Sequence, residues 1–231
     1  MCAIMIGVSK TGLPGIGILS ITLISGIMPA RQATGFILPM LIMGDIFAVA
    51  YYRRHAVWPH LFRIFPWAAL GIIIGAMIMG RITDQVLRPV IGLIILGMLV
   101  LHYWNSRRQN LTIPTQWWFA APIGLAAGIT TMMANAAGPI LIIYLLAMRL
   151  PKNEFIGTGA WYFLLLNCFK VPFGVNLGII TPQSLGFNAA LFPCIALGAI
   201  AGFKLLPIIP EKRFADIMQI LAAIAAVKLL F

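Results

Sequence analysis

The feature that most constrains this chain is a run of forty consecutive residues, from Gln109 to Met148, without any Asp, Glu, Lys or Arg. As one straight helix the run would be about 60 Å long, roughly twice the hydrocarbon thickness of a bilayer. We therefore predict that it breaks and turns inside a membrane. The break is expected at Asn135 to Pro139, because Pro139 has no backbone N–H and Gly138 tolerates unusual dihedral angles. Backbone without helical hydrogen bonds persists at membrane depth only where it is buried in protein or lines a cavity. This break is therefore a candidate binding site.

The composition indicates a polytopic membrane protein. Hydrophobic residues make up 61% of the 231 residues and charged residues only 9%, whereas about a quarter of an ordinary soluble domain is charged. A net charge of +11 would suggest nucleic acid as the partner of a soluble chain. Here most basic residues lie between apolar segments, where they signal topology. We expect the lipid bilayer and no nucleic acid as partner. The three cysteines show no ligand spacing, and we expect neither a metal nor a cofactor.

Charged residues divide most of the chain into apolar segments. Six full spans are predicted: Ala33–Tyr52, Ile64–Gly80, Pro89–Trp104, Phe155–Leu177, Leu185–Leu206 and Phe214–Phe231. The first span is followed by a predicted basic loop, which holds Arg53, Arg54, His55, His60 and Arg63. Three glycines and a proline between Gly12 and Gly17 interrupt the N-terminal apolar segment, much as the Asn135 to Pro139 break interrupts the long run.

The two halves of the chain, residues 1–108 and 109–231, resemble each other. An offset of 122 residues pairs Pro29 with Pro151 and Asp45 with Asn167. The glycine-rich break near Gly15 then falls on the second break. Weak internal symmetry with an interrupted segment in each half is typical of transporters that bind substrate between repeats. Chance matching of small apolar residues is the alternative.

The distribution of basic residues favours an inverted arrangement of the halves. Lys10 and Lys170 are left out because they lie within apolar segments. If each interrupted segment enters and returns on one side, ten basic residues face one side and four the other; if each crosses once, the split is eight to six. The positive-inside rule favours the first arrangement. We therefore predict an all-α integral membrane protein of two inverted repeats, each a re-entrant helical hairpin plus three transmembrane helices.

The two breaks are expected to form an anion site near the bilayer midplane. Half-helices that begin there direct free N–H groups and the positive end of a helix dipole inward. Lys10, beside the first break, and Lys170, within a span, could add full positive charge, although Lys170 could instead snorkel to the interface. Small and polar residues of the breaks complete the candidate substrate site: Thr11, Gly12, Gly15, Thr131, Asn135, Ala136 and Gly138. Helix packing is an equally valid role for the polar ones.

Asp45 is the one acid well inside a predicted span. Its repeat counterpart is the neutral Asn167, so the halves differ here in their ability to carry a proton. We consider the two residues candidates for proton coupling. Lys170 could be the counter-ion of Asp45, since its repeat-equivalent position, Ala48, lies about one helical turn from Asp45. A structural hydrogen bond is the alternative role for this carboxyl group.

An ordered set of small-residue motifs runs along the chain, in Gly7–Gly17, Ala137–Leu141, Leu150–Lys152, Gly157–Thr158 and Phe163–Pro172. This set resembles the sulfite exporter TauE/SafE family of membrane permeases. The resemblance implies a secondary transporter, an exporter, of sulfite, thiosulfate, sulfoacetate or another organosulfonate in a bacterial or archaeal plasma membrane. An uptake permease for organosulfonates and a passive anion channel are the alternatives, and a homo-oligomer is compatible with either. Neither a phosphate-binding Gly-x-x-x-x-Gly-Lys-Ser/Thr loop nor a His-Glu-x-x-His motif is present, and we do not expect an enzyme.

Overall fold

The computed structural model describes residues 1–14, 16–25, 27–79 and 117–230. Within these ranges the chain is helical and contains no strand, as predicted. The helices are α1 (Cys2–Thr11), α2 (Ile16–Ser25), α3 (Ala30–Tyr52), the 3-10 turn η1 (Arg53–His55), α4 (Trp58–Ile78), α6 (Trp117–Ala134), α7 (Ala137–Ala147), α8 (Lys152–Asn176), α9 (Pro182–Ala190), α10 (Phe192–Ile208) and α11 (Glu211–Leu230).

Several of these helices suit a membrane by their length and apolar character. Among the described residues, Arg31–His55 and Trp58–Ile78 are long and apolar enough to cross one, and the bent pair α9–α10 is a third span if it crosses as a unit. The exposed side chains of α4 and α10 include large apolar ones such as Phe62, Met77 and Leu197, which suits contact with lipid. The predicted span Pro89–Trp104 lies outside the described residues.

Two predicted boundaries were wrong. His60 and Arg63 belong to α4 and not to a loop, because Pro59 occupies the first turn of that helix, where its missing N–H costs nothing. The predicted span Leu185–Leu206 is two helices bent by 51° at Leu191. Pro193 has no N–H to continue the hydrogen bonding of α9, so it begins a new helix.

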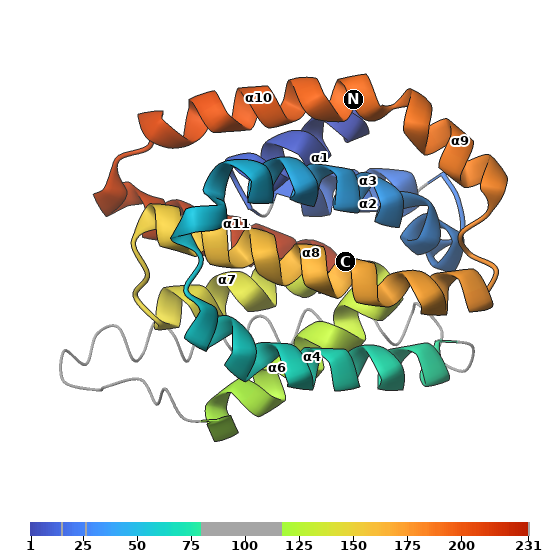
Figure 1. Cartoon of the computed structure of the whole chain (residues 1–231), viewed down its shortest axis with the longest axis horizontal. Helices are drawn as coiled ribbons and strands as arrows, with labels where there is room; N and C mark the ends of the chain where they lie inside the picture. The colour runs from blue at the N-terminus through green and yellow to red at the C-terminus, as the bar shows by residue number, and fades with distance from the viewer. Residues whose placement is uncertain (15, 26, 80–116, 231) are drawn as a thin grey trace.

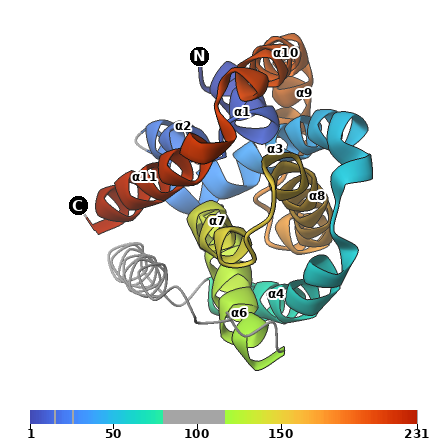
Figure 2. The same cartoon turned by 90° about the vertical axis from the view of Figure 1, so that its left-hand side faces the viewer.

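The long helices α10, α3, α8 and α4 run across the view of Figure 1, one below another. In Figure 2, α3 and α8 lie side by side at the centre, with α1 and α10 on one side and α4 and α6 on the other. This arrangement places α3 and α8, which carry Asp45 and Lys170, in the middle of the molecule.

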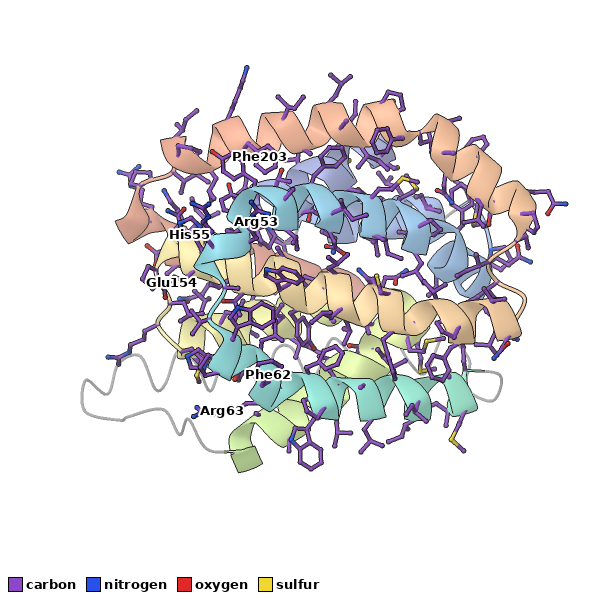
Figure 3. All side chains as sticks on the ribbon, in the orientation of Figure 1. Arg53, His55, Phe62, Arg63, Glu154 and Phe203 are labelled. Atoms are coloured by element: carbon purple, nitrogen blue, oxygen red, sulfur yellow. The ribbon has the colours of Figure 1, made fainter. Side chains whose placement is uncertain are left out.

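The connections rich in basic residues gather at one end of the molecule. In Figure 1, η1, the start of α8 and the α10–α11 connection lie at the left, and the α8–α9 connection lies at the right. Figure 3 labels Arg53, His55 and Glu154 at that left end. Lys152 donates from its amino group to the carbonyl oxygens of Leu206 (3.2 Å) and Ile209 (2.9 Å). This grouping agrees with the uneven split of basic residues, although Arg107 and Arg108 lie outside the described part.

Glycines let two pairs of helices approach very closely. On α4 and α6, a Cβ added to Gly128 would meet the carbonyl oxygen of Ala68, and one added to Gly71 would meet that of Leu125. On α1 and α10, a Cβ added to Gly198 would meet the carbonyl oxygen of Ile4. Such close packing through small residues is the usual way membrane helices associate, since lipid offers them no hydrophobic driving force. Each pair joins one helix of the first half to one of the second.

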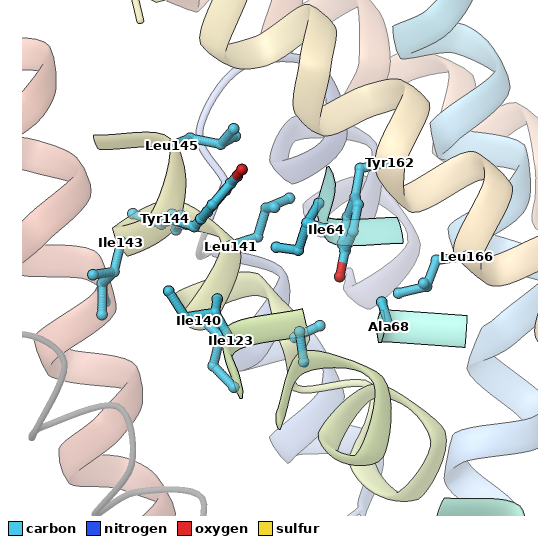
Figure 4. Packing of buried hydrophobic residues seen from close by; sticks show 14 of the residues in the cluster. Ile64, Ala68, Ile123, Ile140, Leu141, Ile143, Tyr144, Leu145, Tyr162 and Leu166 are labelled. Carbon is cyan, nitrogen blue, oxygen red and sulfur yellow. The ribbon is translucent and has the colours of Figure 1, made fainter. Parts of the chain in front are cut away.

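The largest buried apolar cluster lies on the α4, α6, α7 and α8 side of the molecule. Figure 4 shows Ile64 and Ala68 of α4 beside Tyr162 and Leu166 of α8, with Leu141 and Tyr144 of α7 close by. Residues 1–108 and residues 109–231 both contribute to this cluster. The two halves of the sequence therefore share one hydrophobic core. The boundary itself lies outside the described residues.

Candidate functional site

The second break occurs where it was predicted. α6 ends at Ala134, α7 begins at Ala137, and Asn135 adopts a left-handed conformation with φ of 52°, which Asn tolerates better than most residues. The N–H of Asn135 donates to the carbonyl of Thr131 (3.0 Å) and that of Ala136 to the carbonyl of Thr130 (3.3 Å), closing the end of α6. The N-cap residue of α7, Ala136, makes no side-chain cap hydrogen bond, and the first-turn N–H groups of a helix have no partner within the helix.

The first break separates α1 from α2. The N–H of Gly12 donates to the carbonyl of Val8 (2.9 Å), and across the turn the N–H of Gly17 donates to the hydroxyl oxygen of Ser9 (2.9 Å). Tyr52 of α3 donates its hydroxyl to the carbonyl of Thr11 (3.1 Å). Gly15, one of the candidate residues, lies outside the described part of the chain.

Both breaks face a common cavity. Water-sized molecules could place their centres in about 70 Å³ of it, several times the roughly 10–15 Å³ that one water molecule needs. α1, α3, α6, α7 and α8 all contribute to its wall. The polar residues of the wall are Ser9, Lys10, Asp45, Thr131, Asn135 and Asn167, and its apolar part includes Leu141, Ile142, Phe155 and Phe163.

Asp45 is fully buried and is held from two sides. The amino group of Lys10 lies 2.8 Å from its Oδ1, and the side-chain amide of Asn167 donates to its Oδ2 (2.7 Å). The Lys10 amino group also lies 4.1 Å from the centre of the Phe163 ring, a favourable cation–π distance. The counter-ion of Asp45 is therefore Lys10, and the expected pairing with Lys170 was wrong. The repeat placed the position equivalent to Lys170 one helical turn from Asp45. It could not show that α1 packs against α3, where the side chain of Lys10 lies against Gly44.

Lys170 does not snorkel, because its side chain is 1% exposed. Its amino group donates to Oδ1 of Asn135 and to the hydroxyl of Thr131 (3.3 Å). The amide nitrogen of Asn135 in turn donates to the carbonyl of Thr34 (3.1 Å). Lys170 thus lies directly behind two residues of the cavity wall, and Asn135 connects α8 to α3 through the second break.

The other candidate residues divide into two groups. Gly138 lines the cavity, with open space where a Cβ would lie. Thr11 donates its hydroxyl to the carbonyls of Gly7 (3.1 Å) and Ala199 (2.8 Å). Gly12 packs against Gly202, and Ala136 is buried; these three do not belong to the cavity wall.

Two wall residues, Ser9 and Phe163, were missed by the sequence reasoning, and Pro139 was interpreted only as part of the break. Phe163 lies four residues before Asn167, so helical periodicity places both on one face of α8. That spacing could have identified it.

The charged side chains around the cavity sum to one formal positive charge. Around it, the charged side chains in the described part of the chain are Lys10, Asp45 and Lys170. Asp45 balances Lys10, and the described hydrogen-bond partners of Lys170 are neutral. A buried cation without a counter-ion is unfavourable in a low-dielectric interior. An anion in the cavity would supply the missing negative charge.

The comparisons with known proteins identify the family of this chain. Neither a curated protein nor a solved structure matched the chain. A family model, described as the sulfite exporter TauE/SafE, matches residues 1–229, a range that includes every residue of the cavity. With apolar helices long enough to cross a membrane more than once and nearly the whole chain matched, this protein belongs to the sulfite exporter TauE/SafE family of membrane transporters.

Proposed function

We propose that the protein is a secondary transporter that carries a small sulfur-containing anion, such as sulfite, thiosulfate, sulfoacetate or another organosulfonate, through the cavity between the two helix breaks. The observation that carries this proposal is the buried amino group of Lys170, which hydrogen-bonds to Asn135 and Thr131 in the wall of a cavity that both breaks line. The family supports a sulfur anion as the substrate. Its description as an exporter supports outward transport.

In the proposed complex, Lys170, Asn135 and Thr131 hold the anion from one side. The uncapped first turn of α7 at Gly138 faces the same cavity and adds N–H donors and a positive helix end. Lys10 and the first break contribute from the other side. Thr11, Gly12 and Ala136 hold the two breaks in place from outside the cavity, and Gly15 belongs to the first break.

We further propose that the chain consists of two inverted repeats, residues 1–108 and 109–231, in a bacterial or archaeal plasma membrane. The direct hydrogen bond between Asn167 and Asp45, which are 122 residues apart, supports this arrangement, since 122 is the repeat offset. Residues near a two-fold axis contact their own counterparts. Asp45 is the proposed proton carrier in coupled transport, because its ion pair with Lys10 forms part of the cavity wall.

Proteoliposomes would test the proposed function. The purified protein should move radiolabelled sulfite at a rate that saturates, and excess unlabelled sulfite on the opposite side should accelerate the exchange, as expected of a carrier. Protein-free liposomes provide the control. Flux that neither saturates nor responds to sulfite on the opposite side would identify a passive channel. Flux equal to that of the control for sulfite, thiosulfate and sulfoacetate alike would contradict transport of sulfur anions.

A further inference from the structure

We infer that the occupied site is electrically neutral, so that a monovalent anion binds while Asp45 is ionised, whereas a divalent anion binds together with one proton on Asp45. This inference rests on the proposed function and adds to it the relation between the charge of the substrate and the uptake of a proton.

The count of charges at the cavity is the basis of the inference. Asp45 and Lys10 form an ion pair at 2.8 Å, so their charges cancel. Among the described residues, the amino group of Lys170 hydrogen-bonds to the neutral side chains of Asn135 and Thr131. With Lys170 protonated, the empty site therefore holds one net positive charge, which one monovalent anion neutralises.

The neighbouring helices add no further charge at Asp45. α1 contributes Lys10, and α8 contributes Asn167, Lys170 and the neutral thiol of Cys168, which is exposed. α2, α6 and α9 contain no charged residue. The lysine of α10, Lys204, and the basic residues of η1 are exposed to the surroundings of the protein. The balance of charge is therefore set by Lys10, Asp45 and Lys170.

A divalent anion would leave this buried site with one negative charge in excess. Coulomb interactions are strong in a low-dielectric interior, so the excess is unfavourable unless a cation enters as well. Protonation of Asp45 removes the excess and at the same time releases Lys10. Both residues line the cavity, so the freed ammonium can turn from the carboxyl group to the anion.

The geometry indicates which oxygen takes the proton. Oδ2 accepts a hydrogen bond from the Asn167 amide, whereas the polar group that lies against Oδ1 among the described residues is the Lys10 ammonium. A proton from the solvent on the side where the anion enters would bind to Oδ1 as Lys10 leaves. The hydrogen bond from Asn167 would remain, because the protonated carboxyl group still accepts at Oδ2.

Two anions of fixed charge test the inference. Methanesulfonate is monovalent and thiosulfate is divalent throughout the range from about pH 6 to about pH 8, so any change of affinity with pH in that range comes from the protein. Binding linked to the uptake of one proton changes about tenfold per pH unit. We expect the affinity of the wild-type protein for thiosulfate to rise about tenfold for each unit by which the pH falls, and that for methanesulfonate to change less than about twofold.

Asp45→Asn is the matching variant, because it keeps the shape of the protonated carboxyl group and cannot release a proton. Its affinity for thiosulfate should not depend on pH. If the variant does not fold, proton uptake by the wild-type protein tests the inference instead. A pH-sensitive dye should report one proton taken up per thiosulfate bound and none per methanesulfonate bound. Thiosulfate affinity that is independent of pH in the wild type overturns the inference, as does a tenfold slope retained by Asp45→Asn. Binding of methanesulfonate without binding of thiosulfate at any pH also overturns it. If neither anion binds or is transported, the proposed function itself fails.

Discussion

Replacing Lys170 by Met tests the anion site most directly. Met has a similar length and flexibility but no charge, so the variant removes the ammonium that donates to Asn135 and Thr131 and leaves the packing of α8 nearly unchanged. A hydrogen bond to a charged group contributes about 1.5–3 kcal/mol. If the anion takes one such bond from Lys170, the variant should bind it about 10- to 140-fold more weakly.

The assay is equilibrium binding of radiolabelled sulfite to purified protein, with transport in proteoliposomes measured alongside. Lys204→Met provides the matched control, because Lys204 lies exposed on α10 and the same charge is lost away from the cavity. Lys170→Arg should keep part of the affinity, since it keeps the charge but needs more space. Wild-type affinity for sulfite in a folded Lys170→Met protein would refute the role of this lysine in binding.

Three further predictions concern coupling, packing and topology. Asp45→Asn should still exchange sulfite across proteoliposomes but should not concentrate it when a pH gradient is imposed; undiminished proton-driven accumulation would remove Asp45 from coupling. Gly128→Ala should destabilise the protein by about 1–3 kcal/mol, because its Cβ would meet the backbone of α4. Gly186→Ala, where a Cβ meets nothing within 4 Å, should leave the midpoint of thermal unfolding unchanged or slightly raised, and equal midpoints for the two variants would contradict the packing argument. In a cysteine-free background, an impermeant maleimide added to intact cells should label Gln183→Cys and not Arg54→Cys; labelling of both would contradict their location on opposite sides.

The sequence predicted the features that depend on length and on single residues. A bilayer is too thin for the run from Gln109 to Met148, so a break was required, and Gly138 and Pro139 indicated its place. The direct contact of Asp45 with Asn167 could also have been predicted, since in the proposed inverted arrangement a residue near the pseudo-two-fold axis meets its own counterpart. Pro193 indicated a helix start, but the bend before it was not predicted, because no charged residue near Pro193 divides the apolar segment.

The contacts that complete the site could not be predicted, because they depend on how distant helices pack. Lys10 reaches Asp45 only because α1 lies against α3. Asn135 reaches Thr34 across 101 residues of sequence, and no local pattern relates the two. Repeat equivalence identifies residues in similar surroundings, but it does not identify neighbours, which is why the sequence paired Asp45 with the wrong lysine.

The glycine-mediated packing of α1 on α10 also determines when the protein can fold. Thr11 donates to the carbonyl of Ala199, 188 residues later in the chain. At synthesis rates of about 5–20 residues per second, roughly 10–40 s separate the production of these two contact partners. During that interval the face of α1 that contains Gly7 has no helix packed against it, because α10 has not yet been made. A translocon, a lipid or another membrane protein must cover this face until then. Truncation of the chain before Phe192 should therefore leave the first helices inserted without their partner and exposed to membrane proteases.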